Sequence, residues 1–418
     1  MSLKERFLRY VAIDTGSSEE SGQHPSTPVQ WELAKLLERE LKEMGAANVR
    51  LSDTCYVYAE IPANAPEQPV IGLIAHMDTA PAVPTGPVHA RCIVYQGGDI
   101  VLESGAVMRP GEYPSLNRHV GQELIVTDGT TLLGGDDKAG IAEIMELAKR
   151  LIDHPEIPHG KVCIAFTPDE EIGEGADDFD VEGFGADFAY TVDGSMLGEV
   201  ECETFNAASA RVTVTGFNIH PGAAKNRMRN AAKIAMEFAG MLPPAEVPEH
   251  TEGREGFYHL CGIKGDESRA ELVYIIRDHD RAIFEARKQR MVQTADYLNS
   301  VWGEGTVMLE MRDSYYNMKQ EVDKHPHVMQ RALDAMRACR VEPTVAPVRG
   351  GTDGARLSFM GLPCPNLSAG VYNGHGFMEY VSLPEMEKMV EVLEELVRLP
   401  ARPTRCTFDP PSAGRPRS

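Results

Sequence analysis

Residues 70–79 of the chain read VIGLIAHMDT, a short apolar run that leads directly into a His-x-Asp pair. A nearly continuous apolar run of this length is typical of a strand that is buried on both faces of a largely parallel sheet. Residues 162–166 and 188–192 show the same pattern. The three runs therefore predict the central strands of a parallel sheet that is covered by helices on both sides.

Amphipathic helices are predicted around these strands. Apolar residues spaced three and four apart occur over residues 29–44, 141–152 and 386–396, and this spacing gives a helix one apolar face. Ser382 and Glu385 have the spacing of a capping box before the last of these helices. The alternation of helices and buried strands predicts an α/β domain with a mixed, mostly parallel sheet flanked by helices.

The segment from residue 208 to 315 has a different order of elements. Its strands and helices are predicted in the order β-α-β-β-α-β, which is the ferredoxin-like arrangement. We therefore expect an inserted α+β domain with its own core. The predicted main domain is discontinuous and comprises residues 1–207 and 316–400. Residues 401–418 are rich in Pro, Ser and Arg and are expected to form a disordered tail.

The composition is that of a globular protein with an acidic surface. The 418 residues include 41 Lys and Arg and 63 Asp and Glu, which gives a formal net charge of −22. Nucleic acids and anionic membranes attract basic faces, so we expect neither as a partner. No apolar run has the length of a membrane-spanning helix or the pattern of a signal peptide. The eight cysteines occur singly, so we expect no disulfide framework and a cytoplasmic location.

Residues with metal-binding chemistry follow the predicted strands. His76 and Asp78 are two positions apart in an extended segment, so their side chains point to the same side. Asp136 and Asp137 follow two glycines at the start of a predicted helix. These two acids either cap the helix through its backbone N–H groups or place one carboxylate on a metal ion.

Three consecutive acids, residues 169–171, follow the apolar run at 162–166. An acidic run is usually a solvated surface, but ligands collect at this end of the strands in open α/β sheets. Asp193 ends the next predicted strand, and His375 stands between two glycines. Neighbouring carboxylates in one cleft repel each other, so their presence there indicates cations that neutralise them.

The combined set contains imidazoles and carboxylates but no thiolates. Such a set suits zinc, cobalt or manganese. Five ligands are too many for one tetrahedral ion. They suit two ions roughly 3.5–4 Å apart that share a bridging carboxylate, as in two-metal hydrolases.

These segments, together with several others, carry a resemblance to a known family. The chain resembles the dizinc exopeptidases related to aminoacylase and carboxypeptidase G, and among them the peptidase T family of tripeptide aminopeptidases. The resemblance covers about residues 1 to 400. Beyond the metal-binding segments, it rests on TFNAA at 204–208, NIHPG at 218–222, YIIRD at 274–278, SYYN at 314–317 and RGGTDG at 349–354.

The resemblance implies a zinc-exopeptidase fold, two zinc ions and a role for each candidate residue. Asp136 would bridge the two ions. His76 and Asp193 would complete one site, and Glu171 and His375 would complete the other. The catalytic residues implied by the family are Glu170 as the general base, Asp78 as the residue that orients His76, and His220 as the residue that stabilises the oxyanion.

The same resemblance makes residues 208–315 a lid and dimerisation domain, so a homodimer is expected. His220 would act in the active site of the partner subunit. Arg277 and Arg349 would anchor the peptide carboxylate, and Asn206 would assist at the carbonyl. The implied activity is removal of the N-terminal residue from tripeptides.

Two departures from the family pattern concern substrate selectivity and ligand assignment. Residues 80–82 read APA where an acid is expected, and residues 376–379 read GFME without the second histidine often found there. The alternative function is deacylation of N-acyl amino acids or another amide hydrolysis. A non-catalytic zinc-binding relative is a further alternative, although the base and all ligands are present. Calcium fits poorly because this hard cation prefers oxygen ligands, and the set contains two histidines.

Overall fold

The computed structural model describes residues 1–65, 67–84 and 86–400, so the predicted tail at 401–418 lies outside the described residues. The largest sheet has eight strands. The three predicted central strands are adjacent in it, and β3 pairs in parallel with both β8 and β9. The predicted mixed, mostly parallel sheet is therefore confirmed. The strands of this sheet, in spatial order, are β1 (Ala47–Leu51), β2 (Val57–Ile61), β8 (Val162–Thr167), β3 (Ile71–His76), β9 (Phe188–Gly194), β16 (Asn366–Ser368), β10 (Glu199–Glu203) and β15 (Thr344–Pro347).

Helices cover both faces of this sheet. Successive side chains along a strand point to opposite faces and pack into two different hydrophobic clusters. Leu73 and Ala75 of β3 pack in the cluster that includes α1, α2, α3, α8 and α10. Ile74 between them packs with α4 and α9 on the opposite face. The helices around the large sheet are α1 (Leu3–Val11), α2 (Gln30–Met44), α3 (Gly135–Asp153), α4 (Val181–Phe184), α7 (Lys319–Val322), α8 (Pro326–Ala338), α9 (Asp353–Phe359) and α10 (Leu383–Arg398).

The capping box predicted before α10 is wrong, although the helix itself is confirmed. Ser382 precedes the helix, but its hydroxyl donates to Gln122 Oε1 at 2.7 Å. The Glu385 carboxylate accepts from the Tyr372 hydroxyl at 2.7 Å. Tertiary partners have thus replaced the local capping bonds.

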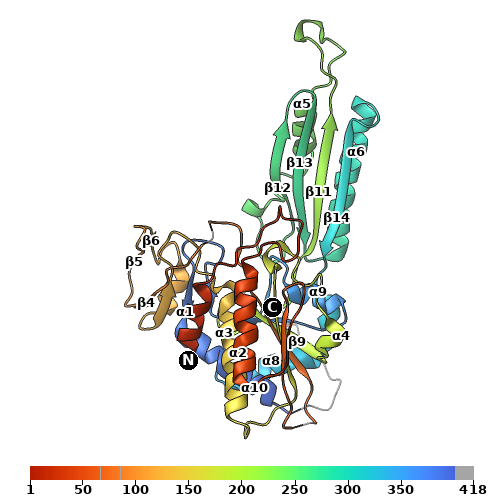
Figure 1. Ribbon diagram of the computed structural model, residues 1–418. Coiled ribbons are helices and arrows are strands. Elements are labelled where there is room, and N and C mark those ends of the chain that lie inside the picture. Colours follow the sequence, from red (N-terminus) through yellow and green to blue (C-terminus); the bar gives the residue numbers. More distant parts are fainter. Residues whose placement is uncertain (66, 85, 401–418) are drawn as a thin grey trace, which may run out of the picture.

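Residues 206–315 form a separate four-stranded antiparallel sheet in the spatial order β12-β13-β11-β14. The helices α5 and α6 pack on this sheet around a hydrophobic cluster of its own. Figure 1 shows this unit projecting from the part of the molecule that holds the large sheet. We retain the division into residues 1–207 with 316–400 and residues 208–315 as a proposal that this second cluster supports. Its elements are β11 (Asn206–Thr215), α5 (Ala231–Gly240), β12 (Phe257–Gly265), β13 (Arg269–Asp278), α6 (Arg281–Trp302) and β14 (Val307–Tyr315).

A third sheet, β17-β18-β7-β4, lies beside the start of α3 and holds the loop that carries His375. In the part of the chain that the structure describes, no helix combines the length and the apolar character that crossing a membrane requires. The cysteines at the described positions are free thiols. The remaining elements are β4 (Arg91–Val94), β5 (Ile100–Val101), β6 (Val107–Met108), β7 (Glu123–Val126), β17 (Val371–Tyr372), β18 (Tyr380–Ser382) and the short 3₁₀ helices η1 (Pro114–Arg118), η2 (Glu170–Ile172), η3 (Pro221–Ala223) and η4 (Pro248–His250).

Candidate metal centre

The candidate ligands meet at the carboxyl ends of three neighbouring parallel strands. His76 is the last residue of β3, Asp193 lies near the end of β9, and Glu171 lies in η2 directly after β8. Asp136 lies at the start of α3, and His375 lies in the loop between β17 and β18. The sheet topology therefore brings residues from five separate segments to one edge.

One carboxylate joins the two imidazoles. Asp136 Oδ1 lies 2.9 Å from Nε2 of His76, and its Oδ2 lies 3.1 Å from Nε2 of His375. A second acid accompanies each imidazole. Asp193 Oδ1 lies 3.4 Å from Nε2 of His76, and Glu171 Oε2 lies 3.0 Å from Nε2 of His375. The residues therefore form two groups that share Asp136.

Asp78 lies behind this centre, where it contacts both a ligand and the turn after β8. It is fully buried, and its Oδ1 lies 3.3 Å from Nδ1 of His76. The two carboxylate oxygens also accept the backbone N–H groups of Glu170 at 3.0 Å and Glu171 at 3.2 Å. Asp78 can therefore fix the ring of His76 and the η2 turn together.

The acids of the centre have strongly shifted protonation equilibria. Burial raises the pKa of the Asp193 and Glu170 carboxyls well above their usual range, and it raises the pKa of Glu171 to about 7. Burial would also raise the pKa of Asp136. Hydrogen bonds with the two imidazoles outweigh that effect and hold its pKa well below the usual range. The pKa shift of Asp136 is therefore opposite in direction to the shifts of Asp193, Glu170 and Glu171.

The two imidazoles have pKa values that are shifted in the opposite direction to that of Asp136. Burial lowers the pKa of His76, but the charge of Asp193 and contacts with neighbouring carboxylates raise it well above the ordinary value. Hydrogen bonds with Asp136 and Glu171 raise the pKa of His375 to about 11. Metal ions bind the deprotonated nitrogen of an imidazole. Metal binding is therefore expected to strengthen as the pH rises.

The donor set fits divalent metal ions. Ligand atoms of His76, Asp136 and Glu171 lie within 4.8 Å of one another, and so do those of His76, Asp137 and Asp193. Glu171 Oε1 is buried and has no hydrogen-bond partner among the described residues. A buried carboxylate oxygen without a donor is costly unless a cation compensates it. Imidazole and carboxylate ligands together suit zinc, cobalt or manganese.

The structure distinguishes the two adjacent acids at the start of α3. Asp137 is fully buried, and its carboxylate accepts the backbone N–H groups of Gly140 and His76, each at 3.2 Å. It therefore makes the helix-capping contact that the sequence left open as an alternative. Asp136 makes the contacts with both imidazoles.

Glu379 is a functional candidate that the sequence interpretation did not identify. Its buried carboxylate accepts the backbone N–H groups of Leu133, Gly134 and Asp136 at 2.7–3.0 Å. Burial raises its pKa to about 7. A Cβ atom on Gly135 would lie only 2.7 Å from Cγ1 of Val381 and 3.1 Å from Glu379 Oε1. In the sequence, Glu379 could be noticed only as an acid close to the candidate ligand His375. The backbone N–H groups that it accepts could not be predicted from the sequence.

The structure does not bring His220 into this centre within one chain. His220 is exposed and immediately precedes η3, in the segment that joins β11 to α5. That segment lies at the end of the projecting unit farthest from β9 (Figure 1). His220 lines a surface pocket of about 660 Å³ together with Asn218 and Met228.

The predicted substrate-binding residues lie near the junction of the two sheets and differ in their contacts. Arg277 is half-buried, and its Nη1 donates to the carbonyls of Ala208 and Ile276. Arg349 donates to the carbonyls of residues 253 and 255 and to the hydroxyl of residue 251. Asn206 is buried, and its amide group bonds with the backbone at residues 278, 279 and 317. Arg277 has the more uncommitted donors, so it is the stronger candidate, and the roles of the other two stay predictions.

Comparisons with known proteins identify the family. The model of the peptidase family M20/M25/M40 matches residues 128–399. The chain is similar to peptidase T of Geobacillus kaustophilus, with 53% identity over 95% of the chain and 98% of that protein. It is also similar to peptidase T of Parabacteroides distasonis, with 50% identity over 96% of the chain and 100% of that protein.

Solved structures share the fold. The aminopeptidase PepT of Bacillus cereus superposes with a TM-score of 0.73 at 22% identity and covers 95% of this chain and 97% of its own. The YXEP protein of Bacillus subtilis, described as a dinuclear metal binding peptidase from the M20 family, superposes with a TM-score of 0.61 at 14% identity and covers 95% of this chain and 96% of its own. From the family match and the half-identical relatives, the chain belongs to the peptidase family M20/M25/M40 and, within it, to the peptidase T group of metallo-exopeptidases.

Proposed function

We propose that the chain is an aminopeptidase that removes the N-terminal residue from tripeptides with the help of two divalent metal ions, zinc in the first instance. The observation that carries this proposal is the position of Asp136 between His76 and His375, 2.9 and 3.1 Å from their Nε2 atoms. A carboxylate in this position is suited to bridge two ions. The name of the half-identical relatives, peptidase T, supports the substrate class.

In this proposal each ion has its own ligands and shares one. His76 and Asp193 would hold one ion, Glu171 and His375 would hold the other, and Asp136 would be the shared ligand. Ions bound in this way supply the positive charge that makes water a nucleophile near neutral pH. Asp78 keeps His76 oriented with Nε2 toward the centre.

Glu170 is the proposed general base. Its backbone N–H is fixed by Asp78 at 3.0 Å, while no described residue donates a hydrogen bond to its carboxylate. Burial raises the pKa of this carboxyl well above its usual range, which makes it a stronger base than an exposed glutamate. The carboxylate accepts a proton from the attacking water and then delivers it to the nitrogen of the departing amine.

Arg277 is the proposed anchor for the carboxylate of the tripeptide. Its Nη1 is held by two backbone carbonyls, and its guanidinium lies 5.4 Å from the centre of the Tyr315 ring. Three further N–H donors of the guanidinium can meet a carboxylate in a bidentate manner. Arg349 and Asn206 remain proposed contributors, although their hydrogen bonds support the junction between the two sheets.

His220 is proposed to act across a homodimer formed through residues 208–315. Its exposure at the end of the projecting unit agrees with a role in a partner subunit, where it would stabilise the oxyanion. The cytoplasm remains the proposed compartment, because single cysteines without a pairing pattern are typical of proteins from reducing environments.

Metal analysis combined with a substrate comparison tests the proposed function. The purified protein should contain two divalent ions per chain, and it should hydrolyse trialanine faster than dialanine or N-acetylalanine. A preference for N-acetylalanine would favour the deacylase alternative. Hydrolysis of the C-terminal bond of trialanine would overturn the aminopeptidase assignment. Trialanine with an isotopic label in its first residue distinguishes the two bonds by mass spectrometry, because an aminopeptidase releases the label as free alanine.

A further inference from the structure

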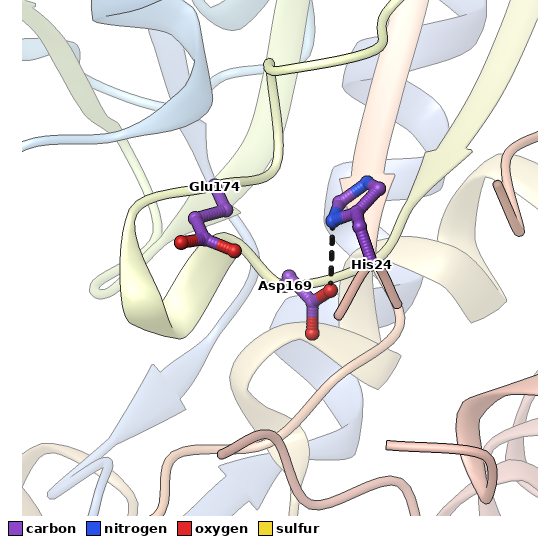
Figure 2. A group of neighbouring side chains, drawn as sticks. All are labelled: His24, Asp169 and Glu174. Atoms are coloured by element: carbon purple, nitrogen blue, oxygen red, sulfur yellow. Dashed lines mark ion pairs between the residues drawn. The ribbon is translucent and has the colours of Figure 1, made fainter. Parts of the chain in front are cut away.

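A second group of metal-binding residue types lies behind the base, outside the centre described above. It comprises His24, Asp169 and Glu174, whose ligand atoms lie within 4.8 Å of one another. Asp169 immediately precedes Glu170, and its backbone has a φ of 57°, in the left-handed region. Figure 2 shows the Asp169 carboxylate directed toward the ring of His24, with the Glu174 side chain on the neighbouring loop.

Both oxygens of the Asp169 carboxylate already have partners from the segment at residues 24–30. Oδ1 accepts the Ser26 hydroxyl at 2.5 Å and Gln30 Nε2 at 2.6 Å. Oδ2 accepts the Ser26 backbone N–H at 2.7 Å and lies 3.0 Å from Nδ1 of His24. Gln30 Oε1 also accepts the backbone N–H of Asp169 at 3.3 Å. A metal ion would have to displace these groups, so the contacts favour an anchor over a third metal site.

His24 is itself held in place from its other side. The Tyr56 hydroxyl accepts the backbone N–H of Asp178 at 3.3 Å and lies 3.1 Å from Nε2 of His24. When that hydroxyl donates to Nε2, the ring proton is on Nδ1 and faces Asp169. The contact with Asp169 has a hydrogen-bond distance but lies outside hydrogen-bond angles, so the ring N–H acts mainly as a dipole that faces the carboxylate.

The turn that carries the base is thereby held at two places. Asp78 binds the backbone N–H groups of Glu170 and Glu171, and the side chain of Asp169 binds the segment that begins at His24. A glycine adopts the left-handed conformation of residue 169 more easily than an aspartate. An aspartate with a fully buried carboxylate at this position therefore indicates that the side chain is needed as an anchor.

We propose that Asp169 and His24 are positioning residues that set the orientation of the Glu170 carboxylate by anchoring the turn to the segment at residues 24–30. This inference rests on the proposed function of Glu170 as the base. It gives the N-terminal segment a part in catalysis without any contact to substrate or metal.

Substitutions at His24 test the proposal, because asparagine and glutamine imitate different ring nitrogens. Asn places its Nδ2 where His has Nδ1, so His24→Asn keeps a donor toward Asp169. His24→Gln places its amide nearer the position of Nε2 and Tyr56. We expect His24→Ala and His24→Gln to lower kcat about tenfold with KM within twofold of the parent, and His24→Asn to recover most of kcat. His154→Ala, at an exposed histidine that directly follows α3, is the matched control.

Three further measurements separate positioning from stability and from metal binding. The melting temperatures of the Asn and Gln variants should agree within a few degrees, and every variant should keep the parent's metal content. His24→Ala should cause no further loss of kcat in a Glu170→Gln background, because the group that it positions is then absent. Asp169→Asn provides a second variant at the anchor itself and should lower kcat in the same way.

The possible results are distinguishable. Parent kcat in His24→Ala, equal recovery by Asn and Gln, or additive losses with Glu170→Gln would each overturn the positioning role. Loss of one metal equivalent in His24→Ala would instead assign the group as a metal site. Full activity of Glu170→Gln would show that the proposed base is wrong, whereas an inactive Glu170→Gln with a fully active His24→Ala would reject only this inference.

Discussion

Asp136 Oδ2 lies 3.1 Å from Nε2 of His375, although 239 positions separate the two residues in the chain. The contact joins the start of α3 to the loop between β17 and β18. Since the other oxygen of Asp136 contacts His76, the bridging position depends on three segments that are distant in sequence.

Glu170→Gln should remove the base but keep the metals. The amide cannot accept the proton of the attacking water, so kcat should fall by about 10² to 10⁴-fold. Glutamine has nearly the same size as glutamate, and the neighbouring ligands are unchanged, so the metal content and melting temperature should match those of the parent. Single-turnover kinetics with trialanine measures the loss. A variant with parental kcat would reject the base assignment.

Glu379→Ala should weaken metal binding although Glu379 is not a proposed ligand. The substitution leaves the backbone N–H groups of Leu133, Gly134 and Asp136 without their acceptor. The bridging carboxylate then loses its fixed position, and metal affinity should fall about 10- to 100-fold. Titration of the metal-free protein with zinc measures the affinity. Glu387→Ala, at an exposed position of α10, is the control and should leave it unchanged.

His220→Ala should abolish activity without loss of metal, because the residue lies outside the metal centre. If His220 acts across a dimer, a mixture of inactive His220→Ala and inactive Glu170→Gln should recover activity. Random mixing of equal amounts creates heterodimers in which one of the two active sites has both residues intact. The activity of the mixture is measured after subunit exchange. Absence of recovery in confirmed heterodimers would place His220 in its own subunit's site or outside catalysis.

Glu143 should make the protein less stable as the pH rises. It is fully buried in α3, and both carboxylate oxygens have no hydrogen-bond partner among the described residues. Burial raises its pKa well above the usual value. The folded chain therefore keeps a proton that the unfolded chain releases above about pH 4.3, and the free energy of unfolding decreases as the pH rises through this range, by up to about 1.4 kcal/mol per pH unit.

Glu143→Gln should remove this dependence. Urea unfolding between pH 5 and 8 should show that the variant gains stability relative to the parent as the pH increases. Comparing the variant with the parent cancels the pH dependence of the metal centre. Glu43→Gln, at an exposed position of α2, should follow the parent at every pH. A constant difference between Glu143→Gln and the parent would show that Glu143 ionises normally in the folded protein.

The parts of the fold that the sequence predicted are those with a strong local pattern. The apolar runs at 70–75, 162–166 and 188–192 became β3, β8 and β9, because a strand buried on both faces needs apolar residues at every position. The order β-α-β-β-α-β, predicted for residues 208–315 from periodicity, is also the observed order. The capping box at Ser382 failed because Gln122, distant in sequence, bonds its hydroxyl.

The candidate site also has some features that the sequence predicted and others that only the structure shows. Residue type and position after a strand were enough to select His76, Asp193 and Glu171 as candidates for a metal centre. The family resemblance pointed to Asp136, but the residue types alone left the choice between Asp136 and Asp137 open, since adjacent acids at a helix start have the same local pattern. It depends on which carboxylate faces His375 and which accepts the N–H of Gly140.

By itself, the sequence determined the element order, the buried strands and the chemical types of the candidate ligands. Buried strands and amphipathic helices require apolar residues at regular local spacing, and this spacing can be read directly from the sequence. Only the tertiary structure shows that Asp136 contacts both imidazoles, that Glu379 holds the backbone at the start of α3, and that Asp169 is anchored by the segment at residues 24–30. These contacts connect segments far apart in the chain. Their partners are selected by how the whole sheet packs and not by any local pattern.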